Sequence, residues 1–296
     1  MYKTRGIEWI TIDIKGEDIL KKILIIIISA ILICLTGLGV IGYYVEKDKA
    51  AEKTNAKVEE KVDQIAEEEK LVVDINKLDI EKIEGYTPGE GVASEDNSQN
   101  TTVGGMSIPY SIPYKNMEIV SIGEYSGKFI EDGSDVNKEN VLAIIVKNTS
   151  QEVIDYGEIT MKIKGKTETI KFKITNLKPG ACTLVMESSG KIKFNSDDKY
   201  IYLASKNNMV SSLPTMESQV AITTENKKIT VENLSDKNLN TVYVYYKTVS
   251  PGNCYLGGIT YRAKFEKVEG GKSVSTNTIH FSNTNSEILK VESVKE

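Results

Sequence analysis

The C-terminal part of the chain alternates between apolar and polar residues, and this pattern constrains its fold more than any other feature. Apolar side chains occupy every second position over residues 159–163, 170–174 and 259–265. Because the side chains of a strand point to opposite faces in turn, each stretch is expected to bury one face and expose the other. Turn residues recur at short intervals and no amphipathic helix interrupts the strands, which is typical of an antiparallel β-sandwich.

The same part of the chain contains an internal repeat. The segment VKNTSQEVI at 146–154 aligns with VENLSDKNL at 231–239, which lies 85 residues later. The alignment places Asn148 on Asn233, and each is followed two residues later by a serine. Asparagine and serine side chains often hydrogen-bond the nearby backbone, so we expect both pairs to close a turn at the end of a strand.

A further match reveals an insertion. LKPG at 177–180 corresponds to VEGG at 268–271, now 91 residues later, so the second copy carries six extra residues between Lys247 and Ile259. The insertion predicts a longer hairpin in the second copy. Loop extensions on a rigid sandwich are common places for binding residues, and the alternative is a longer turn without function.

The repeat predicts two domains of one design. Each copy is shorter than about 100 residues, which is the size of an immunoglobulin-like sandwich. We therefore expect a first β-sandwich over residues 117–204 and a second over residues 205–296, each folding around its own core.

Near its N-terminus the chain carries an uncharged apolar run. Residues 23–42 read ILIIIISAILICLTGLGVIG, twenty residues that would span about 30 Å as a helix, the thickness of a bilayer's hydrocarbon core. Tyr43 and Tyr44 follow as an interfacial aromatic pair. No small-residue cleavage pattern follows the run. We expect an uncleaved transmembrane helix at 23–44, held in membrane lipid.

Lys21 and Lys22 adjoin the start of this run, which favours a cytoplasmic N-terminal segment over residues 1–22. The protein is then a single-pass protein of the cell membrane, with its C-terminal domains extracellular. Residues 45–83 are expected to form a helical stalk, because the part at 46–71 is rich in Lys, Glu and Ala and lacks Gly and Pro. A short heptad seam there leaves two alternatives, a weak homodimer through the stalk or a solvated single helix. Residues 84–116 are dense in Gly, Ser, Asn and Thr, so a flexible linker is predicted.

The stretch TVYVYYK at 241–247 provides the candidate binding residues. Val242 and Val244 share one face of the expected strand, and the aliphatic face is predicted to point inward, leaving Tyr243 and Tyr245 outside. Tyr255, in the inserted hairpin, is expected to extend the same patch. Exposed tyrosines suit recognition of a protein or a glycan. The alternative is a cross-strand aromatic ladder that only stabilises the sheet.

Composition excludes several classes of site. The single histidine, His280, is expected at a surface or strand edge, and with three scattered cysteines it predicts no metal site. The net charge of −5 argues against nucleic-acid binding. Cys182 and Cys254 are expected to be free thiols, with an inter-domain disulfide as the alternative.

No catalytic constellation is recognisable, and we expect no cofactor and no enzymatic activity. Two acidic pairs, Glu131–Asp132 and Asp197–Asp198, have the setting of solvated turns. A cell-wall hydrolase or transferase that uses such a pair remains the alternative function.

Two stretches resemble a known family. VLAIIVKNTS…EITMKI…LKPG in the first copy resembles FxLYD-type and related immunoglobulin-like extracytoplasmic modules of low-GC Gram-positive bacteria. In the other copy, ITVENLSDKNLNTVYVYYK…YLGGITYRAKF is similar to the same class. Together they cover residues 117–296. The resemblance implies membrane-anchored envelope proteins with a sandwich fold, and it supplies no catalytic residues.

The expected protein is therefore mainly β, with a transmembrane helix and a helical stalk followed by two tandem immunoglobulin-like β-sandwiches. Its expected function is non-catalytic binding or scaffolding in the bacterial cell envelope, with an envelope protein or glycan as partner. A sensory or inhibitory partner of another membrane protein is a further alternative.

Overall fold

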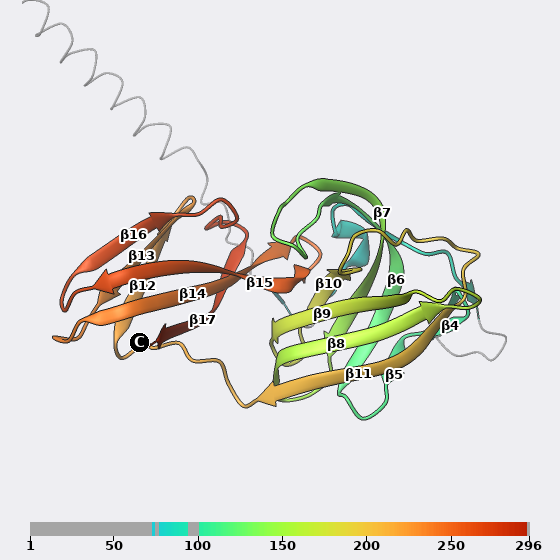
Figure 1. Ribbon diagram of the computed structural model, residues 1–296, viewed down its shortest axis with the longest axis horizontal. Helices are drawn as coiled ribbons and strands as arrows, with labels where there is room; N and C mark the ends of the chain where they lie inside the picture. Colours follow the sequence, from blue (N-terminus) through green and yellow to red (C-terminus); the bar gives the residue numbers. More distant parts are fainter. Residues whose placement is uncertain (1–72, 75–76, 94–100, 295–296) are drawn as a thin grey trace, which may run out of the picture. The chain divides into compact units, whose positions relative to one another are not determined.

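The computed structural model describes residues 73–74, 77–93 and 101–294. The described residues are mostly strands (Figure 1), so the prediction of a mainly β fold is confirmed for them. The expected membrane helix at 23–44 and the segment 1–22 lie outside the described residues, as does most of the expected stalk. In the part of the chain that the structure describes, no helix is long and apolar enough to cross a membrane.

The first repeat consists of six strands, which are β6 (Met117–Lys128), β7 (Asn137–Asn148), β8 (Val153–Ile163), β9 (Thr169–Leu177), β10 (Cys182–Met186) and β11 (Tyr200–Val210). Strands β6, β7 and β10 are neighbours in one sheet, and β11, β8 and β9 form a second sheet. The two sheets pack through their apolar faces: Ile144 and Val185 of the first and Ile159 and Phe172 of the second belong to one buried cluster. The alternating residues predicted to face inward are those that are buried.

The second repeat has the same arrangement. Its strands are β12 (Val220–Glu225), β13 (Lys228–Asn233), β14 (Leu239–Ser250), β15 (Cys254–Val268), β16 (Ser273–Asn277) and β17 (Ser286–Val294). The order β12-β13-β16 corresponds to β6-β7-β10, and β17-β14-β15 corresponds to β11-β8-β9. The internal repeat seen in the sequence is therefore a repeat of the fold.

The two repeats share one sheet. Strand β10 of the first repeat pairs in parallel with β15 of the second, with Thr183 opposite Tyr255 and Leu184 opposite Leu256. This pairing joins β6-β7-β10 to β15-β14-β17 in one eight-stranded sheet, and in Figure 1 β10 and β15 lie at the junction of the two groups of strands. The sequence predicts two separate domains, whereas the structure connects them through backbone hydrogen bonds.

The repeats also share a hydrophobic core. One cluster of buried residues contains Val231 and Phe265 of the second repeat together with Ala143 and Leu184 of the first. The sheet of β6, β7 and β10 is therefore covered on both faces. This explains the unbroken apolar run VLAIIV at 141–146, every residue of which is fully buried. The expectation that each repeat folds around its own core is corrected accordingly.

The predicted insertion lies where the β14–β15 hairpin is extended. Beyond the sandwich, Val249 pairs with Tyr255 and Ser250 pairs with Cys254. Val249 and Tyr255 are both buried in the hydrophobic cluster of the first repeat. The six extra residues thus lengthen a hairpin that docks the second repeat onto the first.

The segment before β6 also contributes to the fold. Its elements are the 3-10 turn η1 (Ile80–Lys82) and the strands β1 (Tyr86–Pro88), β2 (Val92–Ala93), β3 (Thr101–Val103), β4 (Met106–Ile108) and β5 (Tyr110–Ile112). Strands β1 and β5 both pair with β6. The prediction of a flexible linker at 84–116 is wrong for the described part of that segment, because several of its apolar residues, among them Val103 and Ile112, are buried in the cluster of the first repeat.

Two further boundaries differ from the prediction. Strand β11 pairs with β8 as far as Val210, so it crosses the domain boundary expected between residues 204 and 205. The end of the expected stalk instead contacts the inserted hairpin: the backbone N–H of Asp79 donates to the carbonyl of Gly252 (3.0 Å), and Asn253 Nδ2 donates to the carbonyl of Lys77 (2.8 Å). Of the described residues at 77–83, only η1 is helical.

Candidate functional site

The predicted tyrosine pair lies on the outer face of β14. Tyr243 and Tyr245 are half-buried, whereas Val242 and Val244 point into the core, as the sequence predicts. The two tyrosine rings lie 6.2 Å apart between centroids. The guanidinium of Arg262 lies 4.8 Å from the Tyr243 ring.

A second cation and a carboxylate complete this surface. Lys290 Nζ lies 5.0 Å from the centroid of the Tyr245 ring and 2.9 Å from a carboxylate oxygen of Glu292. The Tyr245 hydroxyl donates to the other oxygen of Glu292 at 2.5 Å. We call the surface formed by Tyr243, Tyr245, Arg262, Lys290 and Glu292 the tyrosine face. Its cross-strand contacts stabilise the sheet and hold both rings in place.

The ionisation states on the tyrosine face follow from these contacts. Burial, and then the hydrogen bond to Glu292, raise the pKa of Tyr245. Burial alone would raise the pKa of Glu292, but the hydrogen bonds from Tyr245 and Lys290 outweigh this effect. The pKa of Glu292 is therefore lowered. Tyr245 therefore stays a neutral donor and Glu292 an ionised acceptor near neutral pH.

Tyr255 does not belong to the tyrosine face. Its ring is fully buried, and its hydroxyl donates to Glu287 Oε2 at 2.7 Å. Glu287 in turn forms an ion pair with Lys178 of the first repeat. Tyr255 is a docking residue of the inserted hairpin, which corrects the expectation that it extends an exposed patch.

A cavity lies between the two repeats, where the sequence predicts no site. It has a volume of about 480 Å³, and both repeats line it. His280 Nδ1 lies 2.9 Å from Asp135 Oδ2, and the Tyr261 hydroxyl donates to Asp135 Oδ1 at 2.7 Å. The rings of Tyr261 and His280 stack at 4.3 Å with an interplanar angle of 6°. The His280 side chain is 17% exposed.

This contact fixes the tautomer of His280. A carboxylate only accepts hydrogen bonds, so the Nδ1 atom of His280 carries the proton that bonds Asp135. The other ring nitrogen, Nε2, is then an acceptor when the ring is neutral and a donor when it is charged. Burial, and then Asp135, raise the pKa of Tyr261, so its hydroxyl stays protonated and keeps donating. Asp135 and His280 are 145 residues apart, and only the packing of the two repeats brings them together.

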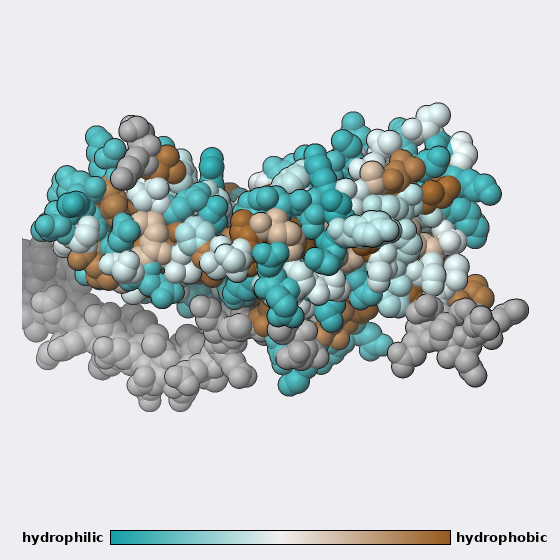
Figure 2. Space-filling view, turned by 90° about the horizontal axis from the view of Figure 1, so that it is seen from below, coloured by the Kyte–Doolittle hydropathy of each residue, from teal (hydrophilic) through white to brown (hydrophobic). Residues whose placement is uncertain are grey.

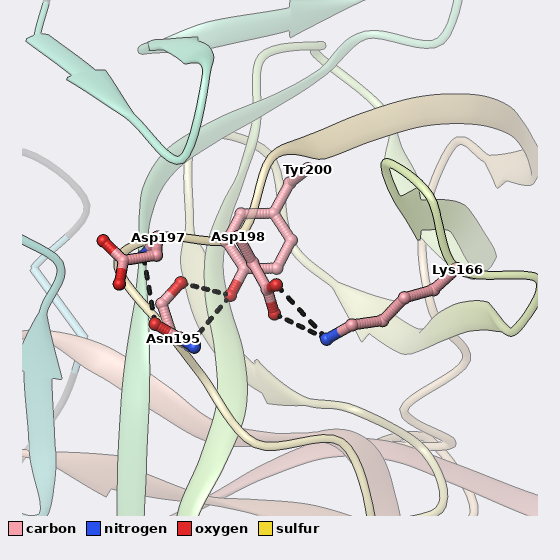
Figure 3. A network of polar contacts seen from close by, with 5 residues as sticks. All are labelled: Lys166, Asn195, Asp197, Asp198 and Tyr200. Atoms are coloured by element: carbon pink, nitrogen blue, oxygen red, sulfur yellow. Dashed lines mark hydrogen bonds and ion pairs between the residues drawn. The ribbon is translucent and has the colours of Figure 1, made fainter.

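The acidic pair Asp197–Asp198 lies in a turn before β11 (Figure 3). Lys166 Nζ bonds both carboxylate oxygens of Asp198, at 3.0 and 3.2 Å. The backbone N–H of Asp197 donates to the side-chain oxygen of Asn195 (3.0 Å), and the Tyr200 hydroxyl bonds the backbone of the same asparagine. These contacts order the turn, so the Asp198 carboxylate has a structural role, whereas Asp197 contributes its backbone N–H.

The acidic pair Glu131–Asp132 differs from the prediction. Asp132 caps a turn through the backbone N–H of Ser134, but Glu131 bridges the two repeats. Glu131 Oε1 accepts the backbone N–H groups of Met186 in β10 (3.0 Å) and of Gly258 in β15 (2.9 Å). Burial raises its pKa to about 7. A solvated turn was expected here, and the structure has an inter-repeat contact instead.

A buried lysine completes the joint between the repeats. Lys247 is fully buried, and its Nζ atom donates to the carbonyls of Gly257 (2.9 Å) and Gly258 (2.8 Å). Burial lowers its pKa to about 7, against the opposing effect of Glu131. The alternating pattern of β14 does not predict the burial of Lys247, because a lysine in such a strand is expected to face solvent.

Cys182 and Cys254 are free and buried. Burial raises the pKa of Cys182 to about 11, so it is a thiol near neutral pH. Across the described ranges, no group of His, Cys, Asp and Glu side chains is arranged to hold a metal ion. On the face of the molecule in Figure 2, hydrophobic residues form small patches among hydrophilic ones.

Comparisons with known proteins do not add to this description. No protein-family model matches the chain, and no curated protein sequence matches it.

Proposed function

We propose that this chain is a membrane-anchored, non-catalytic binding protein of the bacterial cell envelope, with two immunoglobulin-like sandwiches outside the membrane. The observation that carries the proposal is the tyrosine face on a rigid pair of repeats. The apolar run at 23–42 and the resemblance to extracytoplasmic envelope modules support the location.

Rigidity favours binding through this face. The shared sheet, the shared core and the Glu131–Gly258 contact hold the second repeat on the first. A surface that is already ordered loses little conformational entropy when a partner binds. The repeats therefore act as one platform, which suits a scaffolding role.

The composition of the face suits a protein partner. Tyrosine and arginine are enriched among the residues that contribute most to protein interfaces. Arg262 and Lys290 supply positive charge and Glu292 negative charge, so a partner surface with both charges complements it. The proposed partner is another envelope protein.

Location is tested by adding protease to intact cells from which the wall has been removed. We expect residues 73–294 to be degraded while an N-terminal fragment containing 23–44 survives in the membrane. Protection of the whole chain would overturn the proposed orientation.

Binding is tested in the same cells by cross-linking the full-length chain to its neighbours. We expect the variant Tyr243→Thr/Tyr245→Thr to lose a specific cross-linked adduct, because threonine keeps β propensity but removes both rings. Tyr114→Asn is the matched control, since Tyr114 is fully exposed elsewhere and its φ of 58° suits asparagine. An adduct that survives in a folded double variant would show that this face is not the binding surface.

A further inference from the structure

The cavity between the repeats is another candidate site, distinct from the tyrosine face. Its volume of about 480 Å³ falls in the lower half of the range of about 300–1,000 Å³ found for ligand pockets. It therefore suits a small molecule or one or two units of a polymer. Residues of the first repeat, such as Asp135, and of the second, such as His280, both line it.

The charges around the cavity balance. Glu84 and Asp135 contribute two negative charges, and Lys128 and Lys227 contribute two positive ones. Neither a strongly anionic nor a strongly cationic ligand is favoured by such a lining. The balance points to a neutral ligand.

The polar groups of the lining are arranged for hydrogen bonding. Asp135 holds His280 and Tyr261 in fixed positions through hydrogen bonds of 2.9 and 2.7 Å. Of the residues that the structure describes, none hydrogen-bonds His280 Nε2, which leaves this atom available to a ligand hydroxyl. Ser126 and Ser282 also line the cavity, where their hydroxyls already bond Asn140 and Thr284.

Aromatic rings supply the apolar part of the lining together with the aliphatic side chains of Ile130, Leu256 and Ile279. Tyr125, Tyr261 and Phe281 line the cavity and are otherwise buried in the core. A ligand that fits must combine a flat apolar face with hydroxyl groups around its edge. A pyranose ring has this combination, because its C–H groups pack on an aromatic ring while its hydroxyls bond polar side chains.

We infer that the cavity between the repeats binds a neutral pyranose sugar, with Asp135, His280 and Tyr261 as its polar contacts. The inference extends the proposed envelope function by giving the protein a glycan unit as an additional ligand. It does not depend on the protein partner of the tyrosine face.

The test uses the full-length chain in lipid nanodiscs, which avoids detergents that contain sugar. The probe is N-acetylglucosamine, followed by saturation-transfer NMR and a titration for affinity. We expect binding in the millimolar range, which is usual for one small polar ligand. Inorganic phosphate and ethylammonium, the charged comparison probes, are expected not to bind.

Variants then locate the binding. His280→Gln and Asp135→Asn each remove one polar contact and are expected to weaken binding about tenfold. Asparagine tolerates the positive φ of 53° at position 135, so the second variant keeps the backbone.

The variant Tyr243→Thr/Tyr245→Thr separates this inference from the proposed function, because it is expected to bind the probe normally. Absence of N-acetylglucosamine binding by the wild-type chain would overturn the inference. So would unchanged affinity in folded His280→Gln and Asp135→Asn variants, or binding of phosphate in place of the sugar. None of these results bears on the protein partner.

Discussion

Asn148 and Asn233, 85 residues apart, occupy the same position in the two repeats and share four equivalent hydrogen bonds. Both are fully buried at the end of a strand. The Nδ2 atom of Asn148 donates to the carbonyl of Glu152 (2.8 Å), inside the following turn, and to the carbonyl of Leu177 (3.0 Å), at the end of β9. The asparagine thus ties three segments of its repeat together.

The second copy reproduces each contact. Asn233 donates to the carbonyls of Lys237 (2.7 Å) and Val268 (3.0 Å), so the partners are shifted by 85 and 91 residues, the two offsets of the repeat. In both copies the asparagine oxygen accepts the backbone N–H (3.0 Å) and hydroxyl (2.8 Å) of the serine two residues later, Ser150 or Ser235. The predicted asparagine–serine turn is confirmed.

Replacing either asparagine by alanine should destabilise the protein strongly. Asn148→Ala leaves the buried carbonyl of Leu177 without this donor, and such a loss costs about 1–3 kcal/mol. Asn233→Ala should have a similar effect, because it breaks the equivalent contact. The measurement is the free energy of unfolding in urea of residues 69–296, which form one compact unit. The exposed Asn195 provides the control, since Asn195→Ala should cost much less; equal effects at all three positions would contradict the argument.

The second repeat should not reach its native stability alone. In a fragment of residues 205–296, β15 loses its partner β10, and Val249 and Tyr255 lose the first-repeat core in which they are buried. We expect this fragment to unfold at a much lower temperature than residues 69–296, and the larger unit to unfold in one transition. Differential scanning calorimetry distinguishes the outcomes. Two separate transitions in 69–296, one matching the fragment, would indicate independent domains.

Local features of this fold could be predicted from the sequence because they depend on nearby residues. The inward valines Val242 and Val244 follow from strand periodicity, and the Asn148–Ser150 turn follows from short-range hydrogen bonding. The position of the six-residue insertion was also predictable, because an offset between two copies measures chain length directly. Its role was not predictable, since nothing in a hairpin's own sequence states what it docks against.

The features that could not be predicted depend on contacts between distant residues. The segment at 84–116 has the composition of a linker, yet a few apolar residues such as Val103 and Ile112 are buried against the first repeat. The Asp135–His280 contact joins residues of two repeats, and the buried Lys247 interacts with Glu131 of the first repeat. Periodicity assigns residues to faces of a strand but does not say which faces another part of the chain will cover.

Glu131 and Lys247 should make the stability depend on pH with a minimum near neutrality. Burial raises the pKa of Glu131 from its usual 4.5 to about 7, so its contribution to stability is present below about pH 4.5 and is lost as the pH rises through 7. Burial lowers the pKa of Lys247 from 10.5 to about 7, so its contribution is present above about pH 10.5 and is lost as the pH falls through 7. The combined contribution of the two groups to stability is therefore smallest near pH 7.

The control for this dependence is the double variant Glu131→Gln/Lys247→Met, which removes both titrating groups. The free energy of unfolding of residues 69–296 is measured at about pH 5.5, 7 and 9, values that bracket both shifted pKa values. The other titratable groups are the same in both proteins, so their contributions cancel in the difference between the two free energies of unfolding. We expect the wild type to be least stable relative to the variant at pH 7. A difference that is the same at the three pH values would contradict the predicted titration.

Gly258 is the residue of the joint that should tolerate substitution least. Its N–H donates to Glu131 and its carbonyl accepts from Lys247, so its backbone bonds both of these buried groups. A Cβ atom at this position would lie 1.8 Å from the backbone carbonyl oxygen of Lys173, which cannot move without disturbing β9.

Gly258→Ala should therefore destabilise residues 69–296 by about 3 kcal/mol, the upper end of the usual cost of overpacking. Gly157→Ala is the matched control, because Gly157 is also a strand glycine. A Cβ atom at this position would lie 3.3 Å from its nearest neighbour, the side chain of Ile154. The control should cost under about 1 kcal/mol, since a side chain shifts more readily than a backbone carbonyl. Urea unfolding of the two variants gives the comparison. If Gly258→Ala is no more destabilised than the control, the joint is open enough for the repeats to separate, and the cavity between them would not be a fixed site.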